Sequence, residues 1–296
     1  MKKTKLNIKQ KIQKRIEIQN QSLVFINKKT TGKDKQKIYT ESKPVKQNVV
    51  NNFNKIFLEP YEKKCVVDYD AVIVIASYDR FIKLNRILTQ LYEQPTKYKI
   101  KVIVYNDGST DLYYNKLKNI FPEIDYIIGE VNNGKYNYWK TITTLFKKSS
   151  EYISHVVIEI DDDFFLSNNF IDTLIDKFFE GKNISNKNVA IYYHITAGAV
   201  DTWKSTNRVD GGILFDTTFL EKINYTIEPI SEKRWKANKE LGSGVWNQIS
   251  SKIINNGLST YKLENSLAKH DGNDDSKMNK SQRDKSPIYT AKFKED

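Results

Sequence analysis

The chain has 296 residues, of which 39% are hydrophobic and 28% charged, so it is long enough for one large domain or two modest ones with a full core. It has no run of about 18 apolar residues, which argues against a transmembrane helix. Its charged start is not followed by an apolar block, so we expect no secretory signal. The single cysteine, Cys65, excludes an internal disulfide and a zinc site built from cysteines, and a cytoplasmic setting is expected.

The positive charge is concentrated at the N-terminus. Residues 1–66 contain 17 Lys and Arg against 5 Asp and Glu, and this net charge of +12 equals that of the whole chain. The remainder is neutral, which disfavours a nucleic-acid-binding surface on the body. We expect residues 1–66 to be a basic arm that is disordered in part. Alternatively, Ile8, Ile12 and Ile16 form the apolar side of a short helix that binds an anionic membrane surface, a partner or nucleic acid.

Strands and helices are predicted to alternate after residue 70. The apolar run 71–77 is typical of a strand buried on both faces, and residues 101–109 repeat this pattern before a turn. Apolar residues at helical spacing predict a helix over 81–95 that ends at Pro95, and a second helix over 111–121.

The same alternation continues with two more strands, over 125–130 and 155–163. Helices are predicted over 137–148 and 168–181, the latter closed by Gly181. Short spacing between strands and helices favours an α/β domain with a mostly parallel sheet.

The pattern is less regular after residue 185. The predicted elements are strands at 189–198 and 211–215, helices at 217–223 and 245–257, and a strand leading into a polar loop over 259–272.

Polar side chains follow three of the predicted strands. They are Ser77-Tyr78-Asp79, Asn106-Asp107-Gly108-Ser109 and Asp161-Asp162-Asp163. Ligands bind at the carboxyl ends of the strands in such sheets, so we expect these clusters to share one edge.

The aspartate triplet is the sharpest of these features. Three carboxylates in a desolvated place repel one another by several kcal/mol, and a divalent cation removes that cost. Hard oxygen ligands suit Mg²⁺ or Mn²⁺, which keep open positions for substrate phosphates. Capping of the following helix is the structural alternative. The imidazole of His270 is a candidate to complete a Mn²⁺ shell together with Asp163.

Two turns offer further candidates for a ligand site. Asn106 or Asp107 is placed to contact a nucleotide base or ribose, although the same residues are typical of a turn that starts a helix. Asn132-Asn133-Gly134-Lys135 is another strand-to-helix turn, and its lysine is a candidate phosphate contact.

Four segments resemble, in order and spacing, the nucleotide-sugar-binding half of GT-A glycosyltransferases of the large family 2 group. They are AVIVIASYDR, KVIVYNDGSTD, VNNGKYNYWK and HVVIEIDDDFFLSNNFIDTLI. The resemblance implies a Rossmann-like GT-A domain over 67–276, with a nucleotide-sugar-binding half at 67–185 and an acceptor half at 186–276. A charged tail over 277–296 follows.

The resemblance also implies roles on the nucleotide side. Ser77, Tyr78 and Asp79 end the first strand, where the family holds the nucleotide, and Lys135 lies in the loop that faces it. Asn106 stands where the family has an aspartate that reads the base, and this change leaves the base open.

The metal ligands are implied in the same way. Asp161 and Asp163 form the DxD motif, with Asp163 as the direct ligand and Asp161 nearer the ribose or the waters of the metal. Asp162 contacts the sugar. His270, in SLAKHDG, matches a late segment that carries a metal-binding histidine in several members.

The general base is not where the family has it. Inverting members carry an acidic pair at the start of the helix matched here by 245–257, whereas this chain has ELGSGVW before it. Glu240 and Asp210 are the candidate bases that deprotonate the acceptor hydroxyl. Alternatively, the enzyme retains the anomeric configuration and needs no such base.

The sequence thus predicts a Mn²⁺- or Mg²⁺-dependent hexosyltransferase that uses a nucleotide sugar, a UDP-sugar first. The expected acceptor is a glycan or a lipid-linked sugar, in surface polysaccharide synthesis in the cytoplasm or at the inner face of a membrane. One alternative is a transferase acting on hydroxymethylated bases of viral DNA. Others are a nucleotidyltransferase, disfavoured because no Gly-rich basic phosphate loop follows the first strand, and a non-catalytic nucleotide-binding module.

Overall fold

The computed structural model describes residues 66–194, 202–204, 211–237, 244–263 and 265–270. Its strands are β1 (Tyr69–Ser77), β2 (Ile100–Asn106), β3 (Asp125–Ile128), β4 (Ser154–Asp161), β5 (Phe164–Leu166), β6 (Asn188–Tyr192), β7 (Thr202–Lys204), β8 (Ile213–Asp216), β9 (Ser259–Lys262) and β10 (Ala268–His270). Within this described part, eight strands form one sheet in the order β3-β2-β1-β4-β8-β6-β9-β7, and β5 pairs with β10 separately.

The sheet is mostly parallel, as predicted. β1 pairs in parallel with both β2 and β4, and β2 with β3. β8 runs antiparallel to its neighbours β4 and β6, and β7 runs antiparallel to β9. The four parallel strands at the β3 end of the sheet match the four strands predicted before residue 164.

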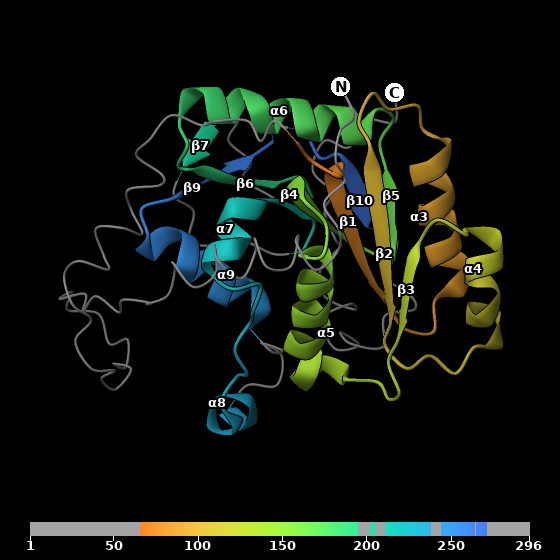
Figure 1. Ribbon diagram of the computed structural model, residues 1–296. Helices are drawn as coiled ribbons and strands as arrows, with labels where there is room; N and C mark the ends of the chain where they lie inside the picture. The colour runs from red at the N-terminus through yellow and green to blue at the C-terminus, as the bar shows by residue number, and fades with distance from the viewer. Residues whose placement is uncertain (1–65, 195–201, 205–210, 238–243, 264, 271–296) are drawn as a thin grey trace.

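Helices cover both faces of this sheet (Figure 1). They are α3 (Phe81–Glu93), the 3₁₀ turn η1 (Leu112–Lys116), α4 (Leu117–Ile120), α5 (Gly134–Ser149), α6 (Phe170–Ile184), α7 (Thr217–Lys222), α8 (Glu232–Ala237) and α9 (Val245–Asn255). One face packs on α3, α4 and α6, and the other on α5, α7 and α9. In the described part of the chain no helix is long and apolar enough to cross a membrane.

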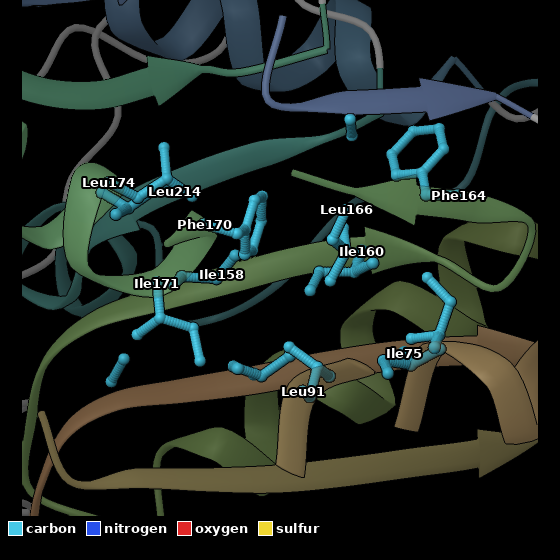
Figure 2. Packing of buried hydrophobic residues seen from close by; sticks show 14 of the residues in the cluster. Ile75, Leu91, Ile158, Ile160, Phe164, Leu166, Phe170, Ile171, Leu174 and Leu214 are labelled. Atoms are coloured by element: carbon cyan, nitrogen blue, oxygen red, sulfur yellow. The ribbon is translucent and has the colours of Figure 1, made fainter. Parts of the chain in front are cut away.

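The core has two halves because the central strands are buried on both sides. Along β1, Ala71, Ile73 and Ile75 face the α3 and α6 side, whereas Val72 and Val74 face α5. Figure 2 shows the first half, where residues of β1, β4, α3 and α6 interdigitate. Alternation of this kind is the reason that the strand reads as a continuous apolar run.

Several boundaries differ from the prediction. The strand expected over 101–109 ends at Asn106, and the helix expected over 111–121 is η1 followed by the single turn of α4. The strand expected over 155–163 ends at Asp161, after which the chain turns into the short β5. The segment 259–272 contains two strands, β9 and β10, which pair with different partners.

Gly181 does not end α6, which is a correction to the prediction. The helix continues to Ile184, and its C-cap is Ser185. The next residue, Lys182, is fully buried and its Nζ lies 2.5 Å from the Asp216 carboxylate. This long-range ion pair keeps the last turn of α6 against the sheet, so packing overrides the local preference of glycine for a helix end.

The Lys182–Asp216 pair joins two parts of the chain far apart in sequence. The Asp216 carboxylate also accepts a hydrogen bond from the Thr218 main-chain N–H at 2.8 Å and so caps α7. The Lys182 ammonium group also donates to the main-chain oxygen of Asn186 at 2.8 Å. The pair thus fixes both α6 and α7 to the end of the sheet that lies opposite the site described below.

We predict that Lys182→Met destabilises the protein by about 3–5 kcal/mol, because removing one partner leaves the other charge buried. The matched control is Lys236→Met, which removes an exposed i,i+4 pair with Glu232 and is expected to cost less than about 1 kcal/mol. Denaturant unfolding of both variants measures these losses. Equal losses for the two variants would show that the buried pair does not anchor α6.

Candidate functional site

The carboxyl ends of β1, β2 and β4 meet at one edge of the sheet. Ser77, the last residue of β1, pairs with Asn106 of β2, and Ala76 pairs with Asp161 of β4. β8 runs in the opposite direction, so the chain around Gly211 begins at this same edge. The expectation that the three polar clusters share one edge is therefore confirmed.

Ser77 holds Asp162, the middle residue of the acidic triplet, in place. Its hydroxyl, which is buried, donates to Oδ2 of Asp162 at 2.7 Å and shares a 2.5 Å hydrogen bond with the Tyr114 hydroxyl. Burial raises the pKa of Tyr114 to about 12, so this phenol stays protonated. The side chain of Ser77 thus belongs to the wall of the site.

Asp79 joins the loops that follow β1 and β2. It has a positive φ of 50°, and its Oδ1 accepts from the Thr110 main-chain N–H at 2.8 Å. Its own N–H donates to the Ser109 hydroxyl at 2.9 Å. Tyr78 and Lys135 lie at the same edge and are partly exposed.

Both polar atoms of the Asn106 side chain are hydrogen-bonded within the protein. Its Nδ2 donates to the Tyr126 hydroxyl at 2.9 Å, and its Oδ1 accepts from the Ser109 N–H at 2.8 Å. A contact between this side chain and a nucleotide base stays a prediction, and these hydrogen bonds give it a second role in shaping the turn.

Asp107 organises the turn before α5. Its carboxylate accepts from the Asn133 main-chain N–H at 3.2 Å, from Asn133 Nδ2 at 2.8 Å, from Asn132 Nδ2 at 3.3 Å and from the Thr141 hydroxyl at 3.2 Å. Burial raises the pKa of Asp107, and the hydrogen bonds from Asn133 offset part of that rise. These contacts explain why α5 starts at Gly134, three residues before its predicted start.

An arginine that the sequence did not single out lies on the acidic triplet. Nη1 of Arg80 is 2.9 Å from Oδ1 of Asp162 and 2.6 Å from Oδ2 of Asp163. Both carboxylates are buried. Burial raises the pKa of Asp162 to about 6, although the charge of Arg80 works in the opposite direction.

Asp161 has no such partner. No hydrogen bond or ion pair reaches its carboxylate from any residue that the structure describes. Burial, followed by the charges of Glu159, Asp163 and Asp162, raises the pKa of Asp161 well above its ordinary value. The structure therefore leaves a carboxyl group without a hydrogen-bond or ion-pair partner among the described residues at the end of β4.

His270 is brought to the triplet by the pairing of β10 with β5. His270 lies opposite Phe164 in this antiparallel pair, and its Nε2 is 3.4 Å from Oδ1 of Asp163. The expected proximity of Asp163 and His270 is thus present, although they are 107 positions apart in the chain. Among the described residues, no three His, Cys, Asp or Glu side chains converge as a ready-made metal site.

The sequence of this α/β domain matches one family model, described as glycosyl transferase family 2, over residues 72–233. The chain belongs to glycosyl transferase family 2. The resemblance drawn from the four sequence segments is confirmed, and so is the expected α/β fold with a mostly parallel sheet. A comparison with curated proteins found no match.

Solved structures of TarS from S. aureus are similar to this family 2 chain at low identity. The crystal structure of TarS residues 1–349 is 13% identical with a TM-score of 0.48, over 67% of this chain and 59% of that one. The same fragment in complex with UDP-GlcNAc is 12% identical with a TM-score of 0.48, over 67% of this chain and 57% of that one. The chain thus spans less than two thirds of the length of these TarS fragments.

Two further residues at this edge were missed by the sequence analysis. Glu159 is buried in β4 and accepts a 2.9 Å hydrogen bond from the Gly212 N–H, and burial raises its pKa to about 7. His194 follows β6 and is 6% exposed, and its Nε2 has no partner among the described residues. Burial, and then His270, lower the pKa of His194 to about 4, so this ring is neutral.

Only Glu159 had a recognisable signal, because it interrupts an apolar strand. The position of Arg80 on the triplet and of His194 beside His270, with ring centroids 6.0 Å apart, depends on the packing of loops. Of the two candidate bases, Asp210 and Glu240 both lie outside the described residues.

We predict that Asp107→Ala lowers the free energy of unfolding by about 2–3 kcal/mol, because several donors around its carboxylate lose a charged acceptor. The control is Asp111→Ala, which removes the exposed cap of η1, a single hydrogen bond of 2.9 Å to the Tyr113 N–H. That loss should be about 1 kcal/mol or less. Chemical denaturation compares the two, and a smaller loss for Asp107→Ala would contradict its role in organising the turn.

Proposed function

We propose that this protein transfers a sugar from a nucleotide-sugar donor to an acceptor hydroxyl, with Mn²⁺ or Mg²⁺ held at Asp161, Asp163 and His270. The observation that carries the proposal is the unpaired carboxyl group of Asp161 next to the Asp163–His270 pair, at the edge of a family 2 domain where the polar clusters meet. A UDP-sugar is the proposed donor, as the sequence resemblance implies, and a hexose is the proposed group.

The residues present fit such a cation. Magnesium sites that bind substrate phosphates use one or two carboxylates and leave the other positions to water and phosphate, so a closed cage of three side chains is not required. Carboxylate oxygens with one imidazole also suit Mn²⁺. When bound, the cation would neutralise the diphosphate as the glycosidic bond breaks.

The protein's own groups supply the rest of the proposed site. Ser77 and Arg80 fix the orientation of Asp162 and Asp163, and Asp162 is proposed to contact the sugar. Tyr78, Asp79, Asn106 and Lys135 remain the proposed nucleotide contacts, together with the loops that they shape.

The acceptor side is proposed to lie next to Asp161. A Cβ atom built on Gly211 would lie 2.7 Å from Oδ2 of Asp161, so the main chain at Gly211 lies directly against that carboxylate. Asp210 and Glu240 both stay the proposed candidates for the general base, because both lie outside the described residues. The proposed acceptor is a glycan or lipid-linked hydroxyl in the cytoplasm. The basic arm's role at a membrane or on nucleic acid stays a prediction, because residues 1–65 are outside the described part.

We predict that Asp163→Ala reduces Mn²⁺-dependent binding of UDP at least about 10-fold, because it removes the proposed direct ligand of the cation. Calorimetric titration of UDP with and without Mn²⁺ measures the loss, and release of UDP from a panel of UDP-sugars measures turnover. Glu123→Ala, which removes an exposed carboxylate from the surface, is the control and should bind as the parent does. Unchanged binding in Asp163→Ala would refute the proposed cation site.

A second prediction separates the site from the scaffold with two glycines. Gly211→Ala places a methyl group against Asp161 and is expected to weaken Mn²⁺-dependent UDP binding about 10-fold. Gly257→Ala meets no atom within 4 Å but has a φ of +64°, so it should cost about 1 kcal/mol of stability and leave binding unchanged. Thermal unfolding and UDP titration of both variants test this. Weakened binding in Gly257→Ala alone would count against the placement of Gly211 at the site.

A further inference from the structure

Arg80 occupies an oxygen of the proposed metal ligand. Its Nη1 lies 2.6 Å from Oδ2 of Asp163, while Oδ1 of the same carboxylate faces Nε2 of His270 at 3.4 Å. Both oxygens of Asp163 are therefore engaged before any cation arrives. The same Nη1 atom reaches Asp162 at 2.9 Å, so one guanidinium compensates two adjacent carboxylates.

The guanidinium is held through one of its nitrogen atoms only. Among the described residues, no hydrogen bond or ion pair of Arg80 is found at Nε or Nη2, and its side chain remains 18% exposed. An arginine presents five N–H donors in a planar fork that matches phosphate oxygens. The unused donors can therefore bind an anion that enters from the open side of the site.

The backbone of Arg80 is fixed, so that only its side chain is free to turn. Its main-chain N–H donates to the Tyr114 hydroxyl at 3.0 Å, and the preceding Asp79 is bonded to the loop after β2. Ser77 keeps its hydrogen bond to Asp162 independently of Arg80. Movement of the guanidinium therefore leaves the orientation of Asp162 intact.

We propose that Arg80 competes with the divalent cation for Asp163, and that the diphosphate of the donor draws Arg80 away, so that cation and nucleotide bind cooperatively. This inference rests on the proposed function. Without nucleotide, Arg80 neutralises the carboxylates and disfavours the binding of free metal. With nucleotide, its fork binds the diphosphate and Oδ2 of Asp163 becomes available. Coupling between two ligands is reciprocal, so each should raise the affinity of the other by the same factor.

The experiment is a titration of the full chain with Mn²⁺, followed by the electron paramagnetic resonance signal of free Mn²⁺, with and without UDP. For the parent chain, UDP is expected to tighten Mn²⁺ binding about 10-fold or more. For Arg80→Met, Mn²⁺ alone is expected to bind about 10-fold more tightly than to the parent, and the further gain from UDP should be smaller than in the parent, because only the direct attraction between cation and diphosphate remains. Lys118→Met, which removes an exposed cation from α4, should behave as the parent chain does.

A second variant tests the same inference in case Arg80→Met does not fold. Arg80→Lys retains the charge on Asp163 but loses the fork, so Mn²⁺ alone should bind as weakly as to the parent while the gain from UDP decreases. The inference is overturned if Arg80→Met is folded and binds free Mn²⁺ no more tightly than the parent does. It is also overturned if UDP tightens Mn²⁺ binding to Arg80→Lys as much as it does for the parent. Absence of Mn²⁺ binding to the parent even with UDP would instead refute the metal site of the proposed function.

Discussion

The candidate site is arranged around four acidic side chains at the end of one buried strand, Glu159 and the triplet Asp161 to Asp163. Carboxylates so close together in a poorly hydrated place raise one another's pKa and destabilise the folded chain unless positive charge or hydrogen-bond donors approach them. The neighbouring loops supply these partners unequally. Asp162 and Asp163 receive Arg80, and Glu159 receives the Gly212 N–H, whereas Asp161 is left without one among the described residues. The Asp161 carboxyl group lies at the edge of the sheet where the polar clusters meet.

The fold brings these groups together through two different kinds of pairing. The parallel register of β1, β2 and β4 places Ser77, Asn106 and Asp161 at one edge, and this follows from strands buried on both faces by α3, α6 and α5. The reversed direction of β8 brings Gly211 to the same edge. The short pairing of β5 with β10 then brings His270 to Asp163 from the far end of the described chain. A rigid sheet thus carries the acids, and the late segments complete the site.

The sequence predicts what depends on local pattern. The apolar runs of β1 and β4, the helical spacing in α3 and the polar clusters after the strands are local features, and they correctly predicted the sheet and the edge where the clusters meet. The end of α6 was wrong because the buried contact of Lys182 with Asp216 overrides the glycine at 181. Arg80 on the triplet and His194 beside His270 were missed because such contacts arise from the relative placement of loops, which no spacing along the chain encodes.

The hydrogen bonds divide the polar residues of this edge into two groups. Asn106, Asp107 and Ser77 are buried, and their side chains are bonded mainly to other loops, so they set the shape of the edge. The carboxylate of Asp161 and the unused donors of Arg80 are not engaged in this way by the described residues. The proposed function needs one acidic and one basic group that are open to an anionic ligand and its cation, held on a fixed frame. Asn106, Asp107 and Ser77 provide that frame. Their side chains are already held by hydrogen bonds, so they lose little conformational entropy when a ligand binds.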